Sequence, residues 1–200
     1  MKKLSLPTKG GCARLANSPR FAGETGATAK RTSGTKIAIV SDSHDNIPNI
    51  EKFLGWVNLN QIEMIIHCGD LAAPSIIKEE LGPKFAGPVH FVHGNVADRE
   101  LSEKIAKQFN HVTCHGDQGE LNIDGKIIAF CHYPLQAEEL AQSGKYDLIF
   151  YGHDHKPWEK QIGKTRLLNP GTLAGMFNKA TFAVYDTKTG QAELILLEKI

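Results

Sequence analysis

Seven side chains of the kinds that bind metal ions occur in five short polar blocks spread over most of the chain. They are Asp42, His44, Asp70, Asn95, His132, His153 and His155. Each block follows a mainly apolar run, at residues 37–40, 64–66, 89–92, 127–130 and 148–151. Short apolar runs bounded by turn residues are typical of buried strands. Because the carboxyl ends of strands in an open α/β sheet face one crevice, we expect the seven side chains to converge there.

The donor atoms of this set belong to three Asp or Asn side chains and four imidazoles, with no cysteine. Such a mixture of hard and borderline ligands suits Mn, Fe, Zn or Ni better than Ca or Mg, and the lack of thiolate disfavours a closed structural zinc site. Seven ligands are too many for one tetrahedral ion. They fit two ions about 3.5 to 4 Å apart that share a carboxylate, an arrangement that holds the attacking and leaving oxygens in phosphoryl transfer.

The five blocks resemble the ordered signature DxH, GD, GN, H and GHxH of the calcineurin-like metallophosphoesterases. In this chain they read Asp42-Ser43-His44, Gly69-Asp70, Gly94-Asn95, His132 and Gly152-His153-Asp154-His155. A further segment, Asn169-Pro170-Gly171-Thr172, is similar to a turn of the small single-domain phosphodiesterase branch found in bacteria and archaea. The resemblance covers almost all of residues 36–200, and the fixed order of five motifs makes it specific.

The resemblance implies a role for each of the seven residues. One ion is expected on Asp42, His44 and His155, a second on Asn95, His132 and His153, with Asp70 as the bridge. It further implies that Asp70, Asn95 and His153 take part in catalysis, and that the nucleophile is a hydroxide held between two divalent metal ions. Mn is the favoured metal, with Fe, Zn or Ni as alternatives.

Two positions depart from the usual family pattern. Many members carry a His directly after the GN block that protonates the leaving group, but this chain has Val96 there. The small phosphodiesterase branch also lacks that His, so Val96 favours a diesterase over a monoesterase with a dedicated acid. Tyr133 follows His132 where Gly is usual. Its phenol is expected either to hydrogen-bond a phosphate oxygen or to narrow the pocket.

Four residues near the blocks are candidates for substrate contacts, namely Asn46, His93, Tyr133 and Asn169. For Asn46, capping of the helix that begins near Pro48 is an equally good interpretation. For His93 the alternative is a structural role at the end of its strand. The histidines at positions 67, 90, 111 and 115 are expected to have packing or surface roles, the last two in a polar connection.

Composition and charge indicate one globular domain with an appendage. The chain has 200 residues, of which 41% are hydrophobic, and no apolar stretch reaches the about 18 residues of a membrane helix. Residues 1–35 hold seven basic residues and one acidic residue, a charge of +6, which leaves −5 on residues 36–200 from a total of +1. We expect a disordered basic extension at 1–35, with a presequence or an upstream start as alternatives, and a metallophosphoesterase domain at 36–200.

Helical apolar spacing predicts helices at residues 48–59, 73–81, 98–109 and 136–142. Further strands are expected at 166–169, 180–185 and 192–197, with a hairpin that turns at Asp124-Gly125. The expected fold is α/β, with two packed mixed β-sheets flanked by helices. Four cysteines at positions 12, 68, 114 and 131 form no metal or disulfide spacing, which is typical of reduced thiols in a cytoplasmic protein.

The expected function is hydrolysis of a small phosphodiester. The same site could serve a phosphomonoesterase or a nuclease, and a non-catalytic protein-binding scaffold like the retromer subunit of this fold is the alternative from another class. The scaffold interpretation is weakened because no ligand is missing. The acidic domain lacks a broad basic face for nucleic acid, no membrane partner is expected, and a homo-oligomer is left open.

Overall fold

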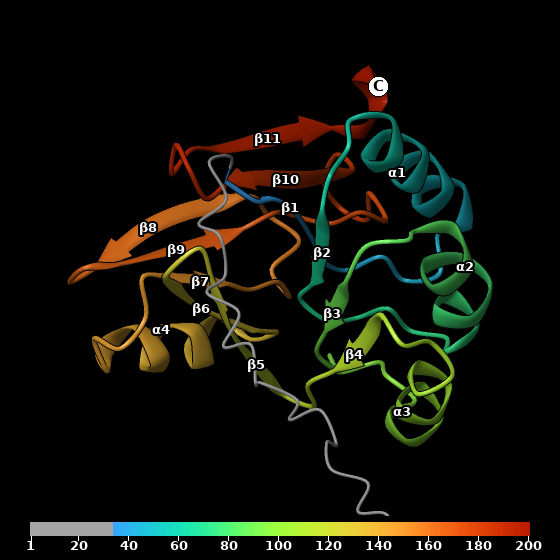
Figure 1. Cartoon of the computed structure of the whole chain (residues 1–200), viewed down its shortest axis with the longest axis horizontal. Coiled ribbons are helices and arrows are strands. Elements are labelled where there is room, and N and C mark those ends of the chain that lie inside the picture. The colour runs from blue at the N-terminus through green and yellow to red at the C-terminus, as the bar shows by residue number, and fades with distance from the viewer. Residues whose placement is uncertain (1–33) are drawn as a thin grey trace, which may run out of the picture. The chain divides into compact units, whose positions relative to one another are not determined.

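The structure, a computed structural model, describes residues 34–200, so nearly all of the predicted extension at 1–35 lies outside the described residues. Two mixed β-sheets pack face to face, with helices on both outer faces (Figure 1). The predicted α/β architecture of two packed mixed sheets is confirmed. Among residues 34–200, no helix is both long and apolar enough to cross a membrane.

The first sheet has six strands in the order β11-β10-β1-β2-β3-β4. Its strands are β1 (Lys36–Val40), β2 (Met64–His67), β3 (Val89–Phe91), β4 (Val112–Cys114), β10 (Thr181–Asp186) and β11 (Ala192–Leu196). The four strands β1 to β4 are parallel, whereas β10 runs antiparallel to β1 and to β11. The carboxyl ends of β1, β2 and β3 therefore meet at one edge of the sheet.

The second sheet has five strands in the order β5-β6-β7-β9-β8. They are β5 (Gln118–Ile123), β6 (Lys126–Cys131), β7 (Leu148–Phe150), β8 (Trp158–Ile162) and β9 (Thr165–Asn169). Strands β6, β7 and β9 are parallel, and β5 and β8 pair antiparallel at the two sides. The hairpin between β5 and β6 turns at Asp124 and Gly125, as the sequence predicts.

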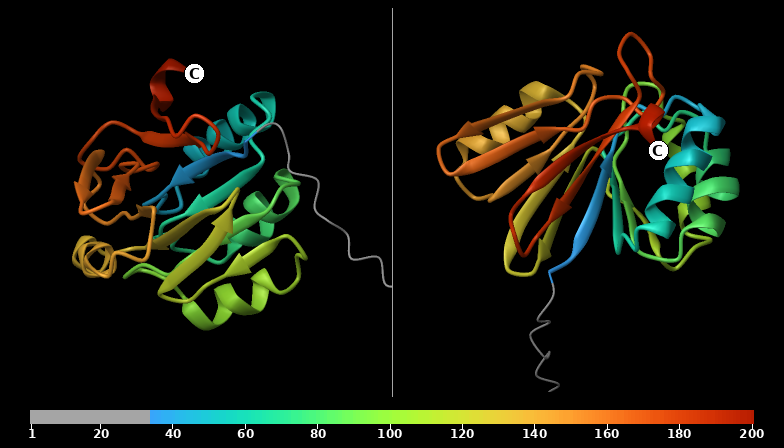
Figure 2. Two further views of the ribbon diagram at one scale, coloured as in Figure 1. Left: turned by 60° about the vertical axis from the view of Figure 1, so that its left-hand side comes forward. Right: turned by 90° about the horizontal axis from the view of Figure 1, so that it is seen from above.

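The helices form the outer layers of the molecule. They are α1 (Ile47–Leu59), the π-helix η1 (Ile76–Leu81), α2 (Gly82–Lys84), α3 (Arg99–Ala106), α4 (Pro134–Gln142) and the 3-10 turn η2 (Leu197–Lys199). Seen from above, α4 lies outside the five-stranded sheet and α1, α2 and α3 lie outside the six-stranded sheet (Figure 2).

Three layers of core form because successive side chains of a strand point to opposite faces. In β1, Ile37 and Ile39 pack between the two sheets, whereas Ala38 and Val40 face the helices. Each apolar run thus fills two cores, which explains why the runs are continuous rather than alternating. The stacked layers hold the strand ends rigidly, and these ends carry the polar blocks.

The structure differs from the sequence predictions at three elements. The connection expected to be polar around residues 111–115 contains the short strand β4, which pairs with β3 at the sheet edge. Strand β8 was not predicted, since it lies at an edge with partly or fully exposed residues and has no apolar run. The helix expected at 73–81 is a π-helix from Ile76, where the Gly82 amide donates to the Ile77 carbonyl five residues back.

Candidate metal centre

The seven predicted ligands all lie just beyond strand ends. Asp42, Asp70 and Asn95 follow β1, β2 and β3 of the six-stranded sheet, and three histidines follow β6 and β7 of the five-stranded sheet. His44, the seventh, lies on the loop between β1 and α1. The site therefore forms where the carboxyl ends of the parallel strands of both sheets come together.

Five of the seven residues have a backbone conformation that side chains rarely adopt. Positive φ angles occur at Asp42 (53°), His44 (40°), Asp70 (54°), His153 (74°) and His155 (56°). Such left-handed residues cost on the order of 1 to 3 kcal/mol each and persist only where their surroundings fix them. Main-chain bonds do so here, since the Asp42 amide donates to the Gly69 carbonyl at 3.0 Å and the His44 amide donates to the Asp70 carbonyl at 3.1 Å. Clustered strain of this kind is typical of functional sites.

One group of donor atoms surrounds Asp42. His155 Nε2 lies 3.3 Å from Asp42 Oδ1 and 3.2 Å from His44 Nε2. His44 Nε2 is 3.8 Å from Asp42 Oδ1 and 3.8 Å from Asp70 Oδ2. Four side chains from three separate parts of the chain thus direct their donor atoms to one point.

A second group lies on the other side of Asp70. His132 Nε2 is 3.5 Å from Asp70 Oδ2 and 3.2 Å from Asn95 Oδ1. His153 Nδ1 is 3.2 Å from Asn95 Oδ1 and 3.3 Å from His132 Nε2. The same oxygen of Asp70 therefore lies near both groups.

Three observations indicate that this set of donor atoms suits divalent metal ions. Ligands about 2.0 to 2.2 Å from a tetrahedral ion are about 3.4 Å apart, which matches the separations in both groups. His44 Nε2 and His155 Nε2 face each other at 3.2 Å, the separation expected of two imidazole nitrogens that bind one ion. Asp42 Oδ1 is buried without a hydrogen-bond partner within the protein, and a buried carboxylate oxygen requires a partner or a cation.

Two glycines allow the backbone to approach the carboxylates closely. A Cβ atom on Gly94 would lie 1.9 Å from Asp70 Oδ1, and one on Gly152 would lie 1.8 Å from Ser41 Oγ and 2.8 Å from Asp42 Oδ2. Any larger residue at Gly94 or Gly152 would therefore clash with the site, which explains the glycines of the GN and GHxH blocks.

Hydrogen bonds from the backbone hold three of the seven side chains. The Val96 amide donates to Asp70 Oδ1 at 3.1 Å, and the His153 amide donates to Asp42 Oδ2 at 3.0 Å. His132 Nδ1 lies 2.8 Å from the Cys68 carbonyl, which can only accept, so the proton is on Nδ1 and the lone pair of Nε2 points toward Asp70. This is the usual way in which a protein presents a ligating histidine to a metal ion.

Burial and charge shift the pKa values of the central groups. Burial raises the pKa of Asp42 above its usual range, despite hydrogen bonds and nearby histidines that lower it. Burial also acts to raise the pKa of Asp70, but His132, the Val96 amide and His44 together outweigh it and the net direction is downward. For His132, burial lowers the pKa, while the Asp70 carboxylate raises it overall. Negative charge at Asp42 is thus poorly compensated by the protein itself, which favours a bound cation.

Two of the four predicted substrate-contact residues use their polar atoms within the protein. The Asn46 side chain accepts from the Asn49 amide at 3.3 Å and donates to the Ala174 carbonyl at 2.9 Å, so it caps α1. Asn169 is buried, donates to the Gly152 carbonyl at 3.0 Å and accepts from the Gly171 amide at 2.9 Å. Its position holds the backbone directly before His153.

The other two predicted contacts differ in position. His93 is buried, and its Nε2 lies 3.3 Å from Glu103 Oε1 and 3.4 Å from Cys114 Sγ. Tyr133 is at the rim of the site, with its ring centroid 5.0 Å from that of His153 and its side chain partly exposed. The Tyr133 side chain is thus open to solvent, whereas that of His93 is not.

Phe177 is a neighbour of the site that sequence patterns do not single out. Its side chain is 91% exposed, its φ is 62°, and its ring centroid lies 6.0 Å from that of His155. An exposed aromatic ring on a strained backbone beside a ligand cluster is a signal that only the structure provides.

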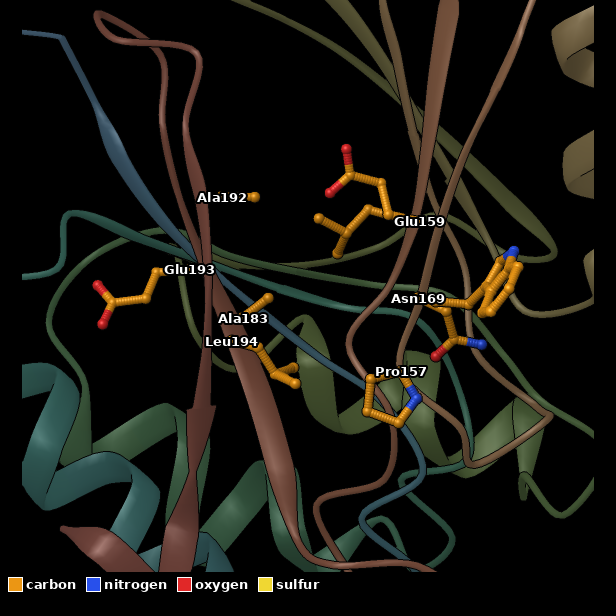
Figure 3. Close-up of a pocket in the computed structure, with 9 residues that line it drawn as sticks. Pro157, Glu159, Asn169, Ala183, Ala192, Glu193 and Leu194 are labelled. Carbon is orange, nitrogen blue, oxygen red and sulfur yellow. The ribbon is translucent and has the colours of Figure 1, made fainter.

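A separate pocket opens between the two sheets, and none of the seven residues lines it (Figure 3). Pro157, Leu168, Asn169, Ala183 and Leu194 contribute to its lining, and its charged members are Glu159 and Glu193. A lining whose only charged side chains are two carboxylates, one of them already paired with Arg166, is unsuited to a phosphate. The strand-end cluster is therefore the better candidate for phosphate chemistry.

Two mixed sheets that bring carboxylate, amide and imidazole ligands together at their strand ends define a metallophosphoesterase class of protein. Residues 35–190 match the calcineurin-like phosphoesterase superfamily domain. The chain therefore belongs to the calcineurin-like phosphoesterase superfamily, whose members use divalent metal ions.

Several proteins are similar over most of the chain. A phosphodiesterase of Methanocaldococcus jannaschii is 30% identical over 166 residues, covering 82% of this chain and 99% of that protein. A probable metallophosphoesterase of Methanothermobacter thermautotrophicus is 25% identical over 145 residues, covering 68% and 76%. The solved structure of an archaeal phosphodiesterase has a TM-score of 0.75 at 28% identity and covers 81% of this chain and 99% of its own. A Vps29 variant of Entamoeba histolytica, with a TM-score of 0.57 at 17% identity and coverage of 81% and 99%, shares the fold.

Proposed function

We propose that this protein is a metal-dependent phosphodiesterase whose ions are held by the seven converging side chains. One ion is assigned to Asp42, His44 and His155, and a second to Asn95, His132 and His153. Asp70 is assigned to both. The observation that carries this proposal is the position of Asp70 Oδ2, which lies 3.8 Å from His44 Nε2 and 3.5 Å from His132 Nε2.

When bound, two such ions supply an activated hydroxide as the nucleophile and neutralise the charge of the phosphate. The protein fixes where these events occur. Asp70 is oriented by the Val96 amide, Asp42 by the His153 amide, and His132 by the Cys68 carbonyl. With these three groups locked, the donor atoms need little reorganisation when ions and substrate bind. Asp70, Asn95 and His153 are the proposed catalytic residues. Asp70 lies between the two ligand groups, and His153 contacts both Asn95 and the rim residue Tyr133.

A phosphodiester is favoured as the substrate over a phosphomonoester by two observations. The M. jannaschii relative at 30% identity is a phosphodiesterase. Residue 96, where many relatives carry an acidic imidazole, is a partly exposed Val in this chain. Without a dedicated acid the protein depends on a leaving group that departs readily.

One aromatic ring stands beside each ligand group and is proposed to contact the substrate. Tyr133 lies against the ring of His153, and Phe177 lies beside His155. Tyr133 is 38% exposed and Phe177 is 91% exposed, so a small phosphodiester with an aromatic or apolar substituent could pack against either ring. Small size is consistent with the net negative charge of residues 36–200, which disfavours binding along a polyanionic nucleic acid.

We also propose the identity of the metal, the extent of the catalytic domain and the location of the protein. Mn is the proposed metal, with Fe, Zn or Ni as alternatives, because the set combines carboxylates with imidazoles. Residues 36–200 are the proposed catalytic domain, with 1–35 as an extension that catalysis does not need. A cytoplasmic location is proposed from the cysteine pattern.

A metal-by-substrate matrix tests the proposed function. The full chain, depleted of metal with a chelator, is assayed with Mn, Fe, Zn, Ni or Mg on an aryl phosphodiester, the matching monoester and single-stranded DNA. Metal-dependent turnover that is greatest for the diester supports the proposal. Turnover greatest for the monoester or DNA identifies the alternative enzymes, and no turnover with any metal favours a scaffold like Vps29.

A further inference from the structure

A second group of metal-ligand side chains lies beside the six-stranded sheet and shares no residue with the seven. It consists of His93 just after β3, Glu103 on α3 and Cys114 at the end of β4. His93 Nε2 is 3.3 Å from Glu103 Oε1 and 3.4 Å from Cys114 Sγ, and all three ligand atoms lie within 4.8 Å of one another. The group contains a thiol, which the seven lack.

Both contacts are made by the same imidazole nitrogen, which fits two ordinary explanations poorly. A nucleophilic triad would need the thiol on one ring nitrogen of His93 and the carboxylate on the other. A hydrogen-bond network would satisfy these atoms only in part, because a proton on Nε2 must be shared between Glu103 and the weakly accepting sulfur of Cys114, whereas a lone pair on Nε2 leaves Glu103 without a donor. A cation at the point where the three atoms converge would satisfy all of them.

The fold holds these three residues in place. Cys114 pairs with Phe91 in the ladder between β3 and β4, and the His93 amide donates to the Gly116 carbonyl at 2.7 Å. Arg99, in the first turn of α3, pairs with Asp117 at 2.7 Å and ties that helix to the segment after β4. The three elements are thus tied to one another by contacts that do not depend on a bound ion.

The site is also reachable from solvent. The His93 side chain is only 2% exposed, whereas the Glu103 side chain is 49% exposed, and Cys114 is half-buried. An ion could therefore enter from the side of Glu103 and keep a water molecule as a fourth ligand, as zinc does on three protein ligands.

We propose that His93, Glu103 and Cys114 form a binding site for a thiophilic divalent cation of the zinc type, distinct from the centre of seven ligands. One nitrogen, one sulfur and one oxygen ligand suit Zn and Co better than Mg, Ca or Mn. The separations of 3.3 and 3.4 Å fit atoms that bind one tetrahedral ion at about 2.0 to 2.3 Å. On binding, the Cys114 thiol loses its proton to solvent and the thiolate becomes the ligand.

The test uses Co(II) as the probe, because a cobalt–thiolate bond gives a sulfur-to-metal charge-transfer band in the near ultraviolet. The seven side chains of the first centre contain no sulfur, so this band reports only a thiolate site. The metal-depleted full chain is titrated with Co(II) and compared with Cys114→Ser, Glu103→Gln and the thiol control Cys12→Ser. Visible Co(II) absorption from the first centre and thermal melting show whether each variant is folded.

The expected result is a saturable band in the parent and in Cys12→Ser. The band should be absent in Cys114→Ser and should need about tenfold or more Co(II) in Glu103→Gln. Zinc bound per chain should fall by one equivalent in Cys114→Ser. No band in the folded parent at excess Co(II), or a band that persists in Cys114→Ser, would overturn the proposal. Neither result bears on phosphodiester turnover, which is measured separately.

Discussion

Gly94 lies directly against the carboxylate of Asp70, so close that a Cβ atom on residue 94 would fall 1.9 Å from Oδ1 and 2.5 Å from the Asp70 amide nitrogen. Asp70 has a short side chain and a strained backbone, with φ of 54°, so its carboxylate has little freedom to move away from residue 94. The glycine of the GN block therefore determines where the proposed bridging carboxylate lies.

Gly94→Ala should accordingly displace Asp70 and weaken metal binding and turnover together. A misplacement of about 1 Å is enough to cost about 10²-fold in rate. Gly55→Ala is the matched control, because a Cβ on this residue of α1 meets nothing within 4 Å. The control should keep full turnover and gain up to about 1 kcal/mol in the free energy of unfolding. Equal turnover in both variants would show that Gly94 does not set the position of Asp70.

The second prediction concerns Val96, which stands where many relatives carry an acid. Rates on aryl phosphodiesters should depend steeply on the pKa of the leaving group, because protonation by a positioned acid typically contributes about 10²- to 10⁴-fold. Val96→His should raise the rate most on poor leaving groups. The measurement is kcat/KM over a series of aryl and alkyl diesters. A flat dependence in the parent that becomes steep in Tyr133→Phe would instead identify Tyr133 as the acid.

Phe177 provides a third prediction, on substrate binding. Phe177→Ala should raise KM for diesters with an aromatic substituent by about 2- to 10-fold, the equivalent of one ring contact of about 0.5 to 1.5 kcal/mol. The value of kcat should change little, since the ring does not touch the ligand atoms. Leu59→Ala, another exposed apolar residue, at the end of α1, is the control and should leave KM unchanged. If both variants behave alike, Phe177 is not a substrate contact.

The buried His67 predicts a pH dependence of stability. Burial lowers the pKa of His67 to about 3, while its Nε2 lies 3.1 Å from Ser43 Oγ. Below about pH 6.5 the unfolded chain binds a proton that the folded protein does not, so stability is full above that pH and falls as the pH drops toward 3.

For the metal-depleted protein, this group alone should remove about 2 kcal/mol from the free energy of unfolding between pH 7.5 and 5. Over the same pH range, the free energy of unfolding of His67→Gln should therefore fall by about 2 kcal/mol less than that of the parent. Urea denaturation at the two pH values measures the difference. Identical pH dependence in the parent and the variant would show that His67 is protonated in the folded protein.

Much of the fold follows from the sequence because the strands are buried on both faces. Runs such as residues 37–40 and 148–150 are continuously apolar, and no other local structure explains them so well. Strand β8 lacks that signal because its side chains lie at an exposed edge, and only pairing with β9 makes it a strand. Strand β4 is too short for a pattern and forms because β3 offers it an edge.

The candidate site likewise has residues that the sequence predicts and residues that it does not. The seven ligands could be predicted because each follows an apolar run, and the strand ends bring them together. The neighbours of His93 could not, because Glu103 and Cys114 come from a helix and a strand whose packing no local pattern encodes. Phe177 was missed for a similar reason, since exposure and a positive φ become visible only in three dimensions.

The central claim is that Asp70 joins two metal ions, and metal content tests it most directly. Asp70→Asn is compared with Asp154→Asn, an exposed acidic residue between two proposed ligands. In a Cys114→Ser background, which removes the separate thiolate site, elemental analysis of chelator-free protein should give two equivalents of metal with Asp70 intact and with Asp154→Asn, but at most one with Asp70→Asn, with turnover lower by several orders of magnitude. Two equivalents retained in Asp70→Asn, or the same loss in both variants, would contradict the assignment.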